Sequence, residues 1–130
     1  MPNHTGTLDR SAIAAAIRDA IGAHGQWKLK LKVAVRTGSS DISPQVASCD
    51  DACRFGKWLY DEVRDPGIRS GMPYQVVRRL HGDFHATAGE VLQLAVSGQA
   101  PKAETLLDGE FSQRSDKLRS ALMKWLGEVR

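Results

Sequence analysis

Two histidines in the stretch HGDFH, His81 and His85, lie four residues apart in this 130-residue sequence. On an α-helix this spacing stacks both imidazoles on one face, where their nitrogens can bind the same metal ion. The pair alone is weak evidence, because two histidines on a surface helix are usually solvated by water. A metal site at this position therefore needs further ligands from other parts of the chain.

His24 and Cys53 are the candidates for those further ligands. His24 continues an apolar helical stripe that includes Ile17, Ile21 and Leu31, and a histidine in such a place is often a core residue hydrogen-bonded to a neighbour. Cys53 is expected in the first turns of a helix, where the helix dipole favours a thiolate. A free cysteine also commonly behaves as a small buried hydrophobic residue. Three imidazoles and one thiolate would fill the tetrahedron that Zn²⁺ prefers.

The elements that must position these four side chains are expected to be helices. Apolar residues recur at spacings of three and four, and turn signals separate predicted helices over residues 8–36, 48–63, 73–97 and 101–128. The piece KLKLKV alternates like a strand, but the helical phase before it continues through it without a turn signal. The predicted fold is all-α: an antiparallel four-helix bundle of three long helices and one short helix that carries the cysteine.

Several residues around the candidate site have predicted supporting roles. The S-x-x-D pattern from Ser48 to Asp51 predicts the start of the short helix. Gly56 lacks a side chain, so it would let a neighbouring helix approach closely. We expect three aromatic side chains to pack around the site and keep water from it: Trp27, Trp58 and Phe84.

Other polar residues near the motifs have weaker predicted roles. Asp51 and Asp83 could accept a hydrogen bond from the second nitrogen of a ligand histidine, although a solvated surface position is the better expectation for each. Cys49 lies four residues before Cys53, about one helical turn away. It could resolve an oxidised Cys53 as a disulfide only with some local unwinding, because disulfide geometry is narrow. An ordinary half-exposed cysteine is the simpler interpretation of Cys49, and His4 lies outside any helical pattern.

Composition and charge set limits on the class of protein. The net charge of +3 is mild and the basic residues are spread along the chain, so binding to nucleic acid is not expected. No run of about 18 uncharged apolar residues is present, so membrane insertion is not expected either. Two cysteines without an export signal predict a reducing, cytoplasmic location. We expect one domain over residues 8–128, preceded by a flexible segment at residues 1–7.

Three motifs in combination make the chain resemble the chemoreceptor zinc-binding domain, or CZB domain, family. They are HGQWK with His24, CRFGKWLY with Cys53, and HGDFH with His81 and His85. Their spacing is also similar, with 28 residues between His24 and Cys53 and 27 between Cys53 and His81. The late segment DGEFSQRSDKL resembles the closing helix of the family. The resemblance covers nearly the whole chain from Leu8 onward.

The resemblance implies a helical bundle that binds Zn²⁺ through His24, Cys53, His81 and His85, forms a homodimer and has a cytoplasmic sensory role in bacterial signalling. Family members are usually attached to chemotaxis receptors or diguanylate cyclases, which they regulate in response to zinc or to oxidants such as hypochlorous acid. Because 130 residues leave no room for an output domain, the chain is expected to be either an excised fragment or a free-standing family member. In the second case, its output partner is a separate protein of one of these classes. Apart from the resemblance, three spare apolar residues could serve a homodimer interface: Ile42, Ile68 and Trp125.

The leading hypothesis is a zinc-dependent regulatory switch rather than an enzyme. Loss of zinc, or oxidation of Cys53 to a sulfenic acid, would free the short helix to shift. A zinc hydrolase is disfavoured, because four protein ligands leave no open coordination position and no glutamate follows His81 as in H-E-x-x-H. A metal-free interaction module is the other alternative, and Ni²⁺ or Cu²⁺ could bind a similar set of ligands.

Overall fold

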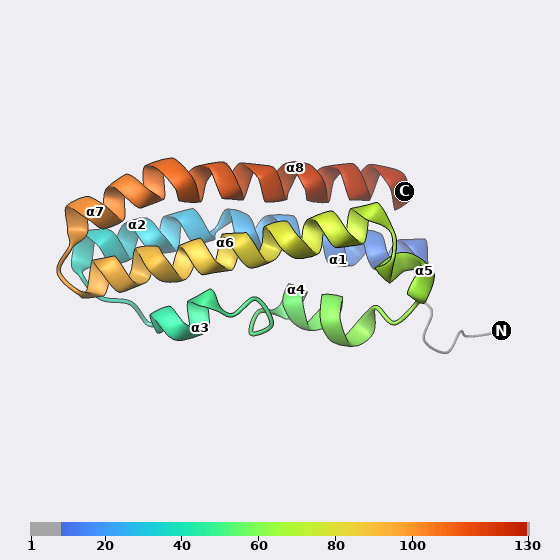
Figure 1. Cartoon of the computed structure of the whole chain (residues 1–130), viewed down its shortest axis with the longest axis horizontal. Coiled ribbons are helices and arrows are strands. Elements are labelled where there is room, and N and C mark those ends of the chain that lie inside the picture. The colour runs from blue at the N-terminus through green and yellow to red at the C-terminus, as the bar shows by residue number, and fades with distance from the viewer. Residues whose placement is uncertain (1–8, 130) are drawn as a thin grey trace.

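The computed structural model describes residues 9–129, and every regular element in this range is helical. The predicted all-α fold class is therefore confirmed. In Figure 1 the chain runs along the long axis of the molecule, returns through a series of short helices, runs along the axis again in α6, and returns in its last helix. The predicted N-terminal segment at residues 1–7 lies outside the described residues.

The first run of the chain is a nearly continuous rod made of α1 (Arg10–Gly25) and α2 (Trp27–Thr37). Asp9 caps α1, because its Oδ1 accepts a hydrogen bond of 2.8 Å from the Ala12 N–H. Gln26 interrupts the rod while keeping helical dihedral angles. The segment KLKLKV is helical within α2, as expected. The rod ends at Gly38, whose φ of 74° is accessible to glycine at little cost.

The return segment differs from the prediction of one short helix over residues 48–63. It contains α3 (Pro44–Ser48), α4 (Arg54–Lys57), the π-helical turn η1 (Trp58–Glu62) and α5 (Pro66–Arg69). Ser48 ends α3 instead of starting a helix, so the predicted capping box with Asp51 is wrong. The caps are Ser43, which accepts from the Val46 N–H, and Cys53, which accepts from the Gly56 N–H. Proline at the first turn of α3 favours this earlier start.

The last two runs agree closely with the predicted helices over 73–97 and 101–128. They are α6 (Met72–Val96), followed by a rod of α7 (Ala100–Leu106), the π-helical turn η2 (Leu107–Phe111) and α8 (Ser112–Val129). Gly98, with φ 78°, makes the turn between the two runs. The π-helical turn η2 contains Gly109 and shifts the helical phase without ending the rod.

The helix α6 is the central element of the molecule. It contacts α2, α3, α7 and α8, while α1 packs against α8. The core contains Ile17 and Leu31 of the first rod, Phe84 of α6 and Leu118 of α8, each at most 1% exposed. Burial of such a side chain stabilises the fold by about 1.5–3 kcal/mol. The two histidines on α6 therefore lie on the helix that has the most packing partners.

The residues predicted to be spare for a dimer interface are occupied within the chain. Trp125 is only 4% exposed and packs against Trp58 and Tyr74, with ring centroids 5.9 and 6.3 Å away. Ile42 and Ile68 are half-buried against the same core. The expectation that Trp125 is free for an interface is therefore wrong, because the return segment already covers it.

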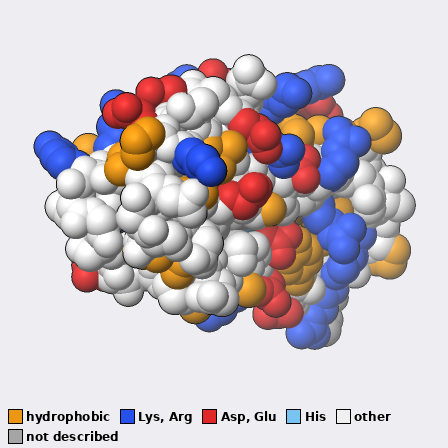
Figure 2. Space-filling model, turned by 60° about the vertical axis from the view of Figure 1, so that its left-hand side comes forward, with side chains coloured by type: hydrophobic (Ala, Val, Ile, Leu, Met, Phe, Trp, Pro, Cys, Tyr) orange, Lys and Arg blue, Asp and Glu red, His pale blue; other side chains and the backbone are white. Residues whose placement is uncertain are grey.

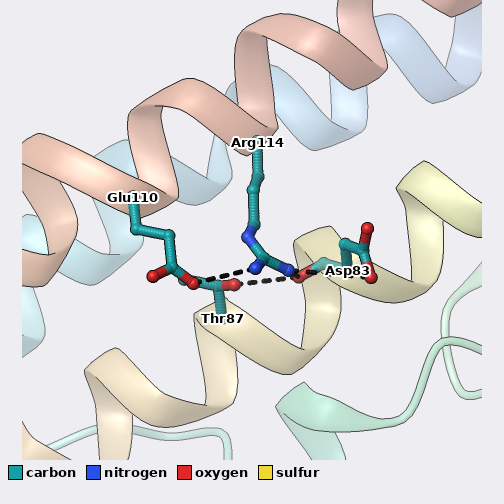
Figure 3. Close-up of polar contacts among 4 residues, drawn as sticks. All are labelled: Asp83, Thr87, Glu110 and Arg114. Atoms are coloured by element: carbon teal, nitrogen blue, oxygen red, sulfur yellow. Dashed lines mark hydrogen bonds and ion pairs between the residues drawn. The ribbon is translucent and has the colours of Figure 1, made fainter.

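A polar contact joins the last rod to α6 at the surface. Arg114 of α8 lies 3.0 Å from Glu110 and 3.6 Å from the carboxylate of Asp83, and Thr87 Oγ1 donates to the Asp83 carbonyl (Figure 3). These groups are partly exposed, so each ion pair contributes less than about 1 kcal/mol. Packing of apolar side chains, rather than these ion pairs, holds α8 on α6.

The face drawn in Figure 2 carries both acidic and basic side chains, with Lys and Arg more frequent along its right-hand side. This mixture agrees with the small net charge of +3. Within residues 9–129, none of the helices combines the length and the apolar character that a membrane-spanning helix requires.

Candidate metal centre

His24 comes from the C-terminal part of α1, on the buried face of the helix. The helical stripe carries it into the core, where it is 6% exposed. Its Nδ1 lies 2.8 Å from the carbonyl oxygen of Ala20, one turn earlier. A carbonyl can only accept a hydrogen bond, so Nδ1 carries the hydrogen and the lone pair of Nε2 is free.

His81 and His85 come from successive turns of α6 and are 0% and 1% exposed. His85 Nδ1 donates to the carbonyl oxygen of Ala47 in α3 at 3.0 Å, which leaves the lone pair on Nε2. His85 Nε2 and His81 Nδ1 are buried and have no hydrogen-bond partner among the described residues. A buried nitrogen without a partner is uncommon in proteins, and the lone pair of His85 Nε2 is available to a cation.

Cys53 is the N-cap of α4 and is half-buried. Its Sγ accepts a hydrogen bond of 3.3 Å from the Gly56 N–H and also lies 3.3 Å from His81 Nε2. The position differs from the predicted one inside a helix. Instead of pointing away from the helix axis, the sulfur lies at the positive end of α4 and beside the imidazole of α6.

The structure brings all four predicted site residues together. One ligand atom from each of His24, Cys53, His81 and His85 lies within 4.8 Å of all the others. Zinc–nitrogen and zinc–sulfur bonds of about 2.0–2.3 Å would place tetrahedral ligand atoms roughly 3.3–3.8 Å apart. Small movements of the side chains would therefore close the cluster around one ion.

The donor set of the cluster fits a cation. The Nε2 atoms of His24 and His81 lie 3.1 Å apart, and the Nε2 of His85 has no partner. Two nitrogen lone pairs at this distance repel one another unless a proton or a cation lies between them. Three imidazoles and one sulfur are the donors that zinc accepts in closed, four-coordinate sites.

Burial keeps the imidazoles of the cluster neutral. It lowers the pKa of His24 to about 4 and that of His81 to about 2, and it also lowers the pKa of His85. Desolvation disfavours the charged form in each case. The three rings therefore retain their lone pairs for a metal at neutral pH.

Burial acts on Cys53 in the opposite sense to the predicted helix dipole. It raises the pKa of the thiol, and the nearby carboxylate of Asp50 adds to the rise, although the Gly56 N–H opposes it. The N-terminal N–H groups of α4 favour the thiolate as expected, but burial outweighs them in the folded chain. A bound cation would supply the positive charge that the thiolate needs.

Aromatic rings surround the cluster. The ring of Phe84 lies edge-on to His24 at 5.1 Å, and that of Trp27 lies edge-on to His85 at 5.8 Å. Trp58 is buried but stacks on Phe55 and not on an imidazole. Phe55, to which no role was assigned from the sequence, lies 5.9 Å from His24 and 5.2 Å from His81. Its place in CRFGKWLY, two residues after the cysteine, was the available signal.

Asp51 and Asp83 do not hydrogen-bond to the histidines, in agreement with the preferred expectation of a surface position for each. Asp51 is exposed, and Asp83 faces Arg114 (Figure 3). Backbone carbonyls orient His24 and His85 instead. The carboxylate of Asp50 is near enough to the cluster that its charge influences both Cys53 and His85. Cys49 is exposed and donates to the Gln45 carbonyl oxygen; a non-helical turn, not one helical turn, separates it from Cys53.

A groove connects the cluster to solvent. It has a volume of about 610 Å³ and lies between α1 and the segment α4–η1, with His24 and Cys53 in its lining. Asp19, Arg54 and Glu62 also line it. The cluster is therefore accessible from one side of the molecule, and the sulfur is its most exposed member.

A buried cluster of three histidines and one cysteine in an all-helical chain defines a metal-binding helical domain. The family model described as "Chemoreceptor zinc-binding domain" (CZB) matches residues 24–92, so the chain belongs to the CZB family, as the motifs predicted. The matched range starts at His24 and contains the other three cluster residues. Zn²⁺ is thus the cofactor, and the family is one of signalling rather than catalysis. Searches of curated proteins and of solved structures returned no match.

Proposed function

We propose that His24, Cys53, His81 and His85 are the zinc ligands of a sensory domain in bacterial signalling. The observation that carries this proposal is the convergence of four potential ligand atoms, distant in sequence, within 4.8 Å of one another. The family match over residues 24–92 supports the same assignment. With four protein ligands, the site is structural and regulatory, because a catalytic zinc site keeps one position open.

The protein's own residues prepare this site before any ion is present. The carbonyl oxygens of Ala20 and Ala47 hold the imidazoles of His24 and His85 with their Nε2 atoms directed to the cluster. The Gly56 N–H holds the sulfur of Cys53. When bound, zinc supplies a cross-link among α1, α6 and the start of α4, and stabilises the thiolate.

Oxidation of Cys53 would open this cross-link. Cys53 lines the groove, so a small oxidant reaches its sulfur from solvent. Hypochlorous acid is the proposed oxidant: the thiolate sulfur gives up two electrons and gains OH, chloride leaves, and a sulfenic acid results. The sulfenic sulfur is a poor zinc ligand, so the return segment loses its attachment to the two histidines of α6 and can shift.

The wider assembly is part of the same proposal. We assign the fold to an antiparallel four-helix bundle over residues 8–128, in which the segment from Pro44 to Arg69 forms the fourth arm. We further propose a cytoplasmic homodimer that acts on a signalling output of the chemoreceptor or diguanylate cyclase class. Measurement of the molecular mass in solution tests the dimer, and a monomer at micromolar concentration would contradict it.

The test of the metal site compares Cys53→Ala with the wild-type chain. We expect about one zinc per wild-type chain by elemental analysis. Removal of the sulfur should weaken zinc binding by more than the roughly 10–100-fold that loss of an outer hydrogen-bond partner costs. Competition with a chromophoric chelator measures this change.

Cys49→Ala is the matched control, because Cys49 is the other free cysteine and lies outside the cluster. It should bind zinc as the wild type does. Equal affinity of Cys53→Ala and the wild type would remove the cysteine from the site. A wild-type chain that binds no zinc would refute the whole proposal.

The redox response is tested by zinc release. Addition of one equivalent of hypochlorite to the loaded protein should release zinc to the chelator in the wild type and in Cys49→Ala. Mass spectrometry should then find the added oxygen on Cys53. Retention of zinc after stoichiometric oxidation of Cys53 would contradict the proposed switch.

A further inference from the structure

The turn between α3 and α4 contains a half-buried carboxylate that the metal cluster does not use. Asp50 lies in this turn, three residues before Cys53, and its Oδ2 accepts a hydrogen bond from Tyr60 Oη. Tyr60 belongs to η1, and the guanidinium of Arg78 lies 5.6 Å from its ring centroid. The bond therefore fastens the turn before the cysteine to the helical segment after it.

The backbone of Asp50 contacts the same segment at a second point. A Cβ atom on Gly56 would lie 1.7 Å from the Asp50 carbonyl oxygen, so the two backbones are in direct contact. The Cys53 thiol is directed to this carbonyl oxygen at 3.9 Å. Asp50 thus contacts the α4–η1 segment twice: its side chain bonds to Tyr60, and its carbonyl oxygen packs against Gly56. Cys53 belongs to the short stretch of chain that these contacts hold in place.

The carboxylate of Asp50 also packs against α6. A Cβ atom on Gly82 would lie 3.2 Å from Asp50 Oδ2, and Gly82 directly follows His81. The carboxylate therefore lies on the backbone of α6 next to the turn that carries two of the proposed ligands. Its place between Tyr60 and α6 fixes the distance from the cysteine turn to the histidine helix.

We propose that Asp50 and Tyr60 are positioning residues for Cys53, and that their hydrogen bond holds the sulfur in the place where it meets the imidazoles. This inference rests on the proposed function, because it assumes that Cys53 binds zinc. Neither residue is among the four that bring a ligand atom to the cluster. Their effect on zinc binding is exerted through the position of the 49–53 turn.

The test uses Asp50→Ala and Tyr60→Phe, which remove the acceptor and the donor of one hydrogen bond. Each variant should bind one zinc per chain with an affinity about 10–100-fold lower than that of the wild type. In the cobalt-substituted protein, the thiolate-to-cobalt charge-transfer band should become weaker or shift. A change confined to overall stability would leave this band unaltered, so the band separates positioning of the sulfur from a general structural role.

Two further variants sharpen the comparison. Asp51→Ala is the matched control, because Asp51 is the next residue, carries the same charge and is exposed; it should leave both the affinity and the band unchanged. Asp50→Asn keeps an oxygen that can accept from Tyr60, and should recover most of the affinity that Asp50→Ala loses. The Asp50→Ala/Tyr60→Phe double variant should bind zinc no more weakly than Asp50→Ala alone, because both changes break one interaction.

The outcomes separate this inference from the proposed function. Wild-type zinc affinity and an unaltered cobalt band in Tyr60→Phe and Asp50→Ala would overturn the positioning role. A large loss of zinc affinity in Cys53→Ala would, in that case, still support Cys53 as a zinc ligand. Loss of affinity in Asp51→Ala equal to that in Asp50→Ala would also overturn it, because local charge would then be the cause. Wild-type affinity in Cys53→Ala would instead refute the function on which the inference rests.

Discussion

At the scale of single residues, Cys53 combines two roles that the sequence motif does not separate. Its sulfur caps α4 by accepting from the Gly56 N–H, and the same sulfur lies 3.3 Å from His81 Nε2. Gly56 is required by both roles, because only a residue without a side chain fits against the Asp50 carbonyl oxygen. The glycine of CRFGKWLY therefore admits the turn that precedes the cysteine rather than a neighbouring helix.

Gly56→Ala tests this requirement. The added methyl group would lie 1.7 Å from a backbone oxygen, so the turn must move, and we expect a loss of about 3 kcal/mol or more in the free energy of unfolding. Urea denaturation of the metal-free protein measures the loss. Zinc affinity should fall as well, because the cysteine moves with the turn.

Gly22→Ala is the control for that substitution. A Cβ atom on Gly22 meets no atom within 4 Å, and the residue is exposed in α1. Alanine favours a helix by about 1 kcal/mol over glycine, so this variant should be more stable than the wild type. Equal effects of the two substitutions would contradict the close contact at Gly56.

The four cluster residues were predictable because their chemistry is specific and their spacing resembles that of a family. Asp50 and Phe55 were not assigned to the site, because their importance depends on a turn and on contacts across the chain. An aspartate in a turn is common in any sequence. Only the pairing of Asp50 with Tyr60 and the approach to Gly82 distinguish it, and both are tertiary contacts.

At the scale of elements, α3 orients one of the proposed ligands although it is only five residues long. Its Ala47 carbonyl oxygen accepts from His85 Nδ1. The helix lies close to α6 because Gly89 leaves room: a Cβ atom there would lie 2.6 Å from Ser48 Cβ and 2.9 Å from the Pro44 carbonyl oxygen. The packing of α3 on α6 therefore sets which nitrogen of His85 faces the cluster.

Gly89→Ala should push α3 away from α6. We expect the free energy of unfolding to fall by about 1–3 kcal/mol and the zinc affinity to fall with it, since the orienting bond to His85 is strained. Denaturation and chelator competition on the same samples measure the two effects. Gly127→Ala, at an exposed position of α8 with nothing within 4 Å of its Cβ, serves as control. Unchanged stability of Gly89→Ala would refute the close packing.

The long helices were predictable and the short ones were not, for a physical reason. Periodicity needs several turns to become visible, and α6 offers 25 residues. Helices of four or five residues, such as α3 and α4, show no period, and their positions follow from caps and prolines. The break at Gln26 and the π-helical turn η1 interrupt helical stretches without ending them, so the apolar period did not reveal them.

At the scale of the whole molecule, zinc binding and folding should be thermodynamically linked. The proposed ligands come from three parts of the chain that meet only in the folded state. A free zinc concentration 1,000 times the dissociation constant should therefore stabilise the fold by about 4 kcal/mol. Calorimetry with and without chelator measures the shift in melting temperature.

The control for this linkage is His85→Ala, which removes one proposed ligand. In the presence of chelator, its melting temperature should be lower than that of the wild type only because the substitution leaves a buried cavity. Addition of zinc should raise the melting temperature of this variant much less than that of the wild type. A wild-type melting temperature that ignores both zinc and chelator would contradict the linkage and favour a metal-free module.

The return segment should determine how zinc dissociates from the site. The helix α4, which Cys53 caps, has four residues and packs mainly on η1 and α1, so its opening requires the loss of fewer contacts than opening of α6. Such fluctuations would detach the sulfur of Cys53 first, while the two imidazoles on successive turns of α6 remain bound to the ion. The lifetime of the zinc complex would then depend on how often this segment opens locally. A competing chelator would remove zinc most readily while only the histidines bind it.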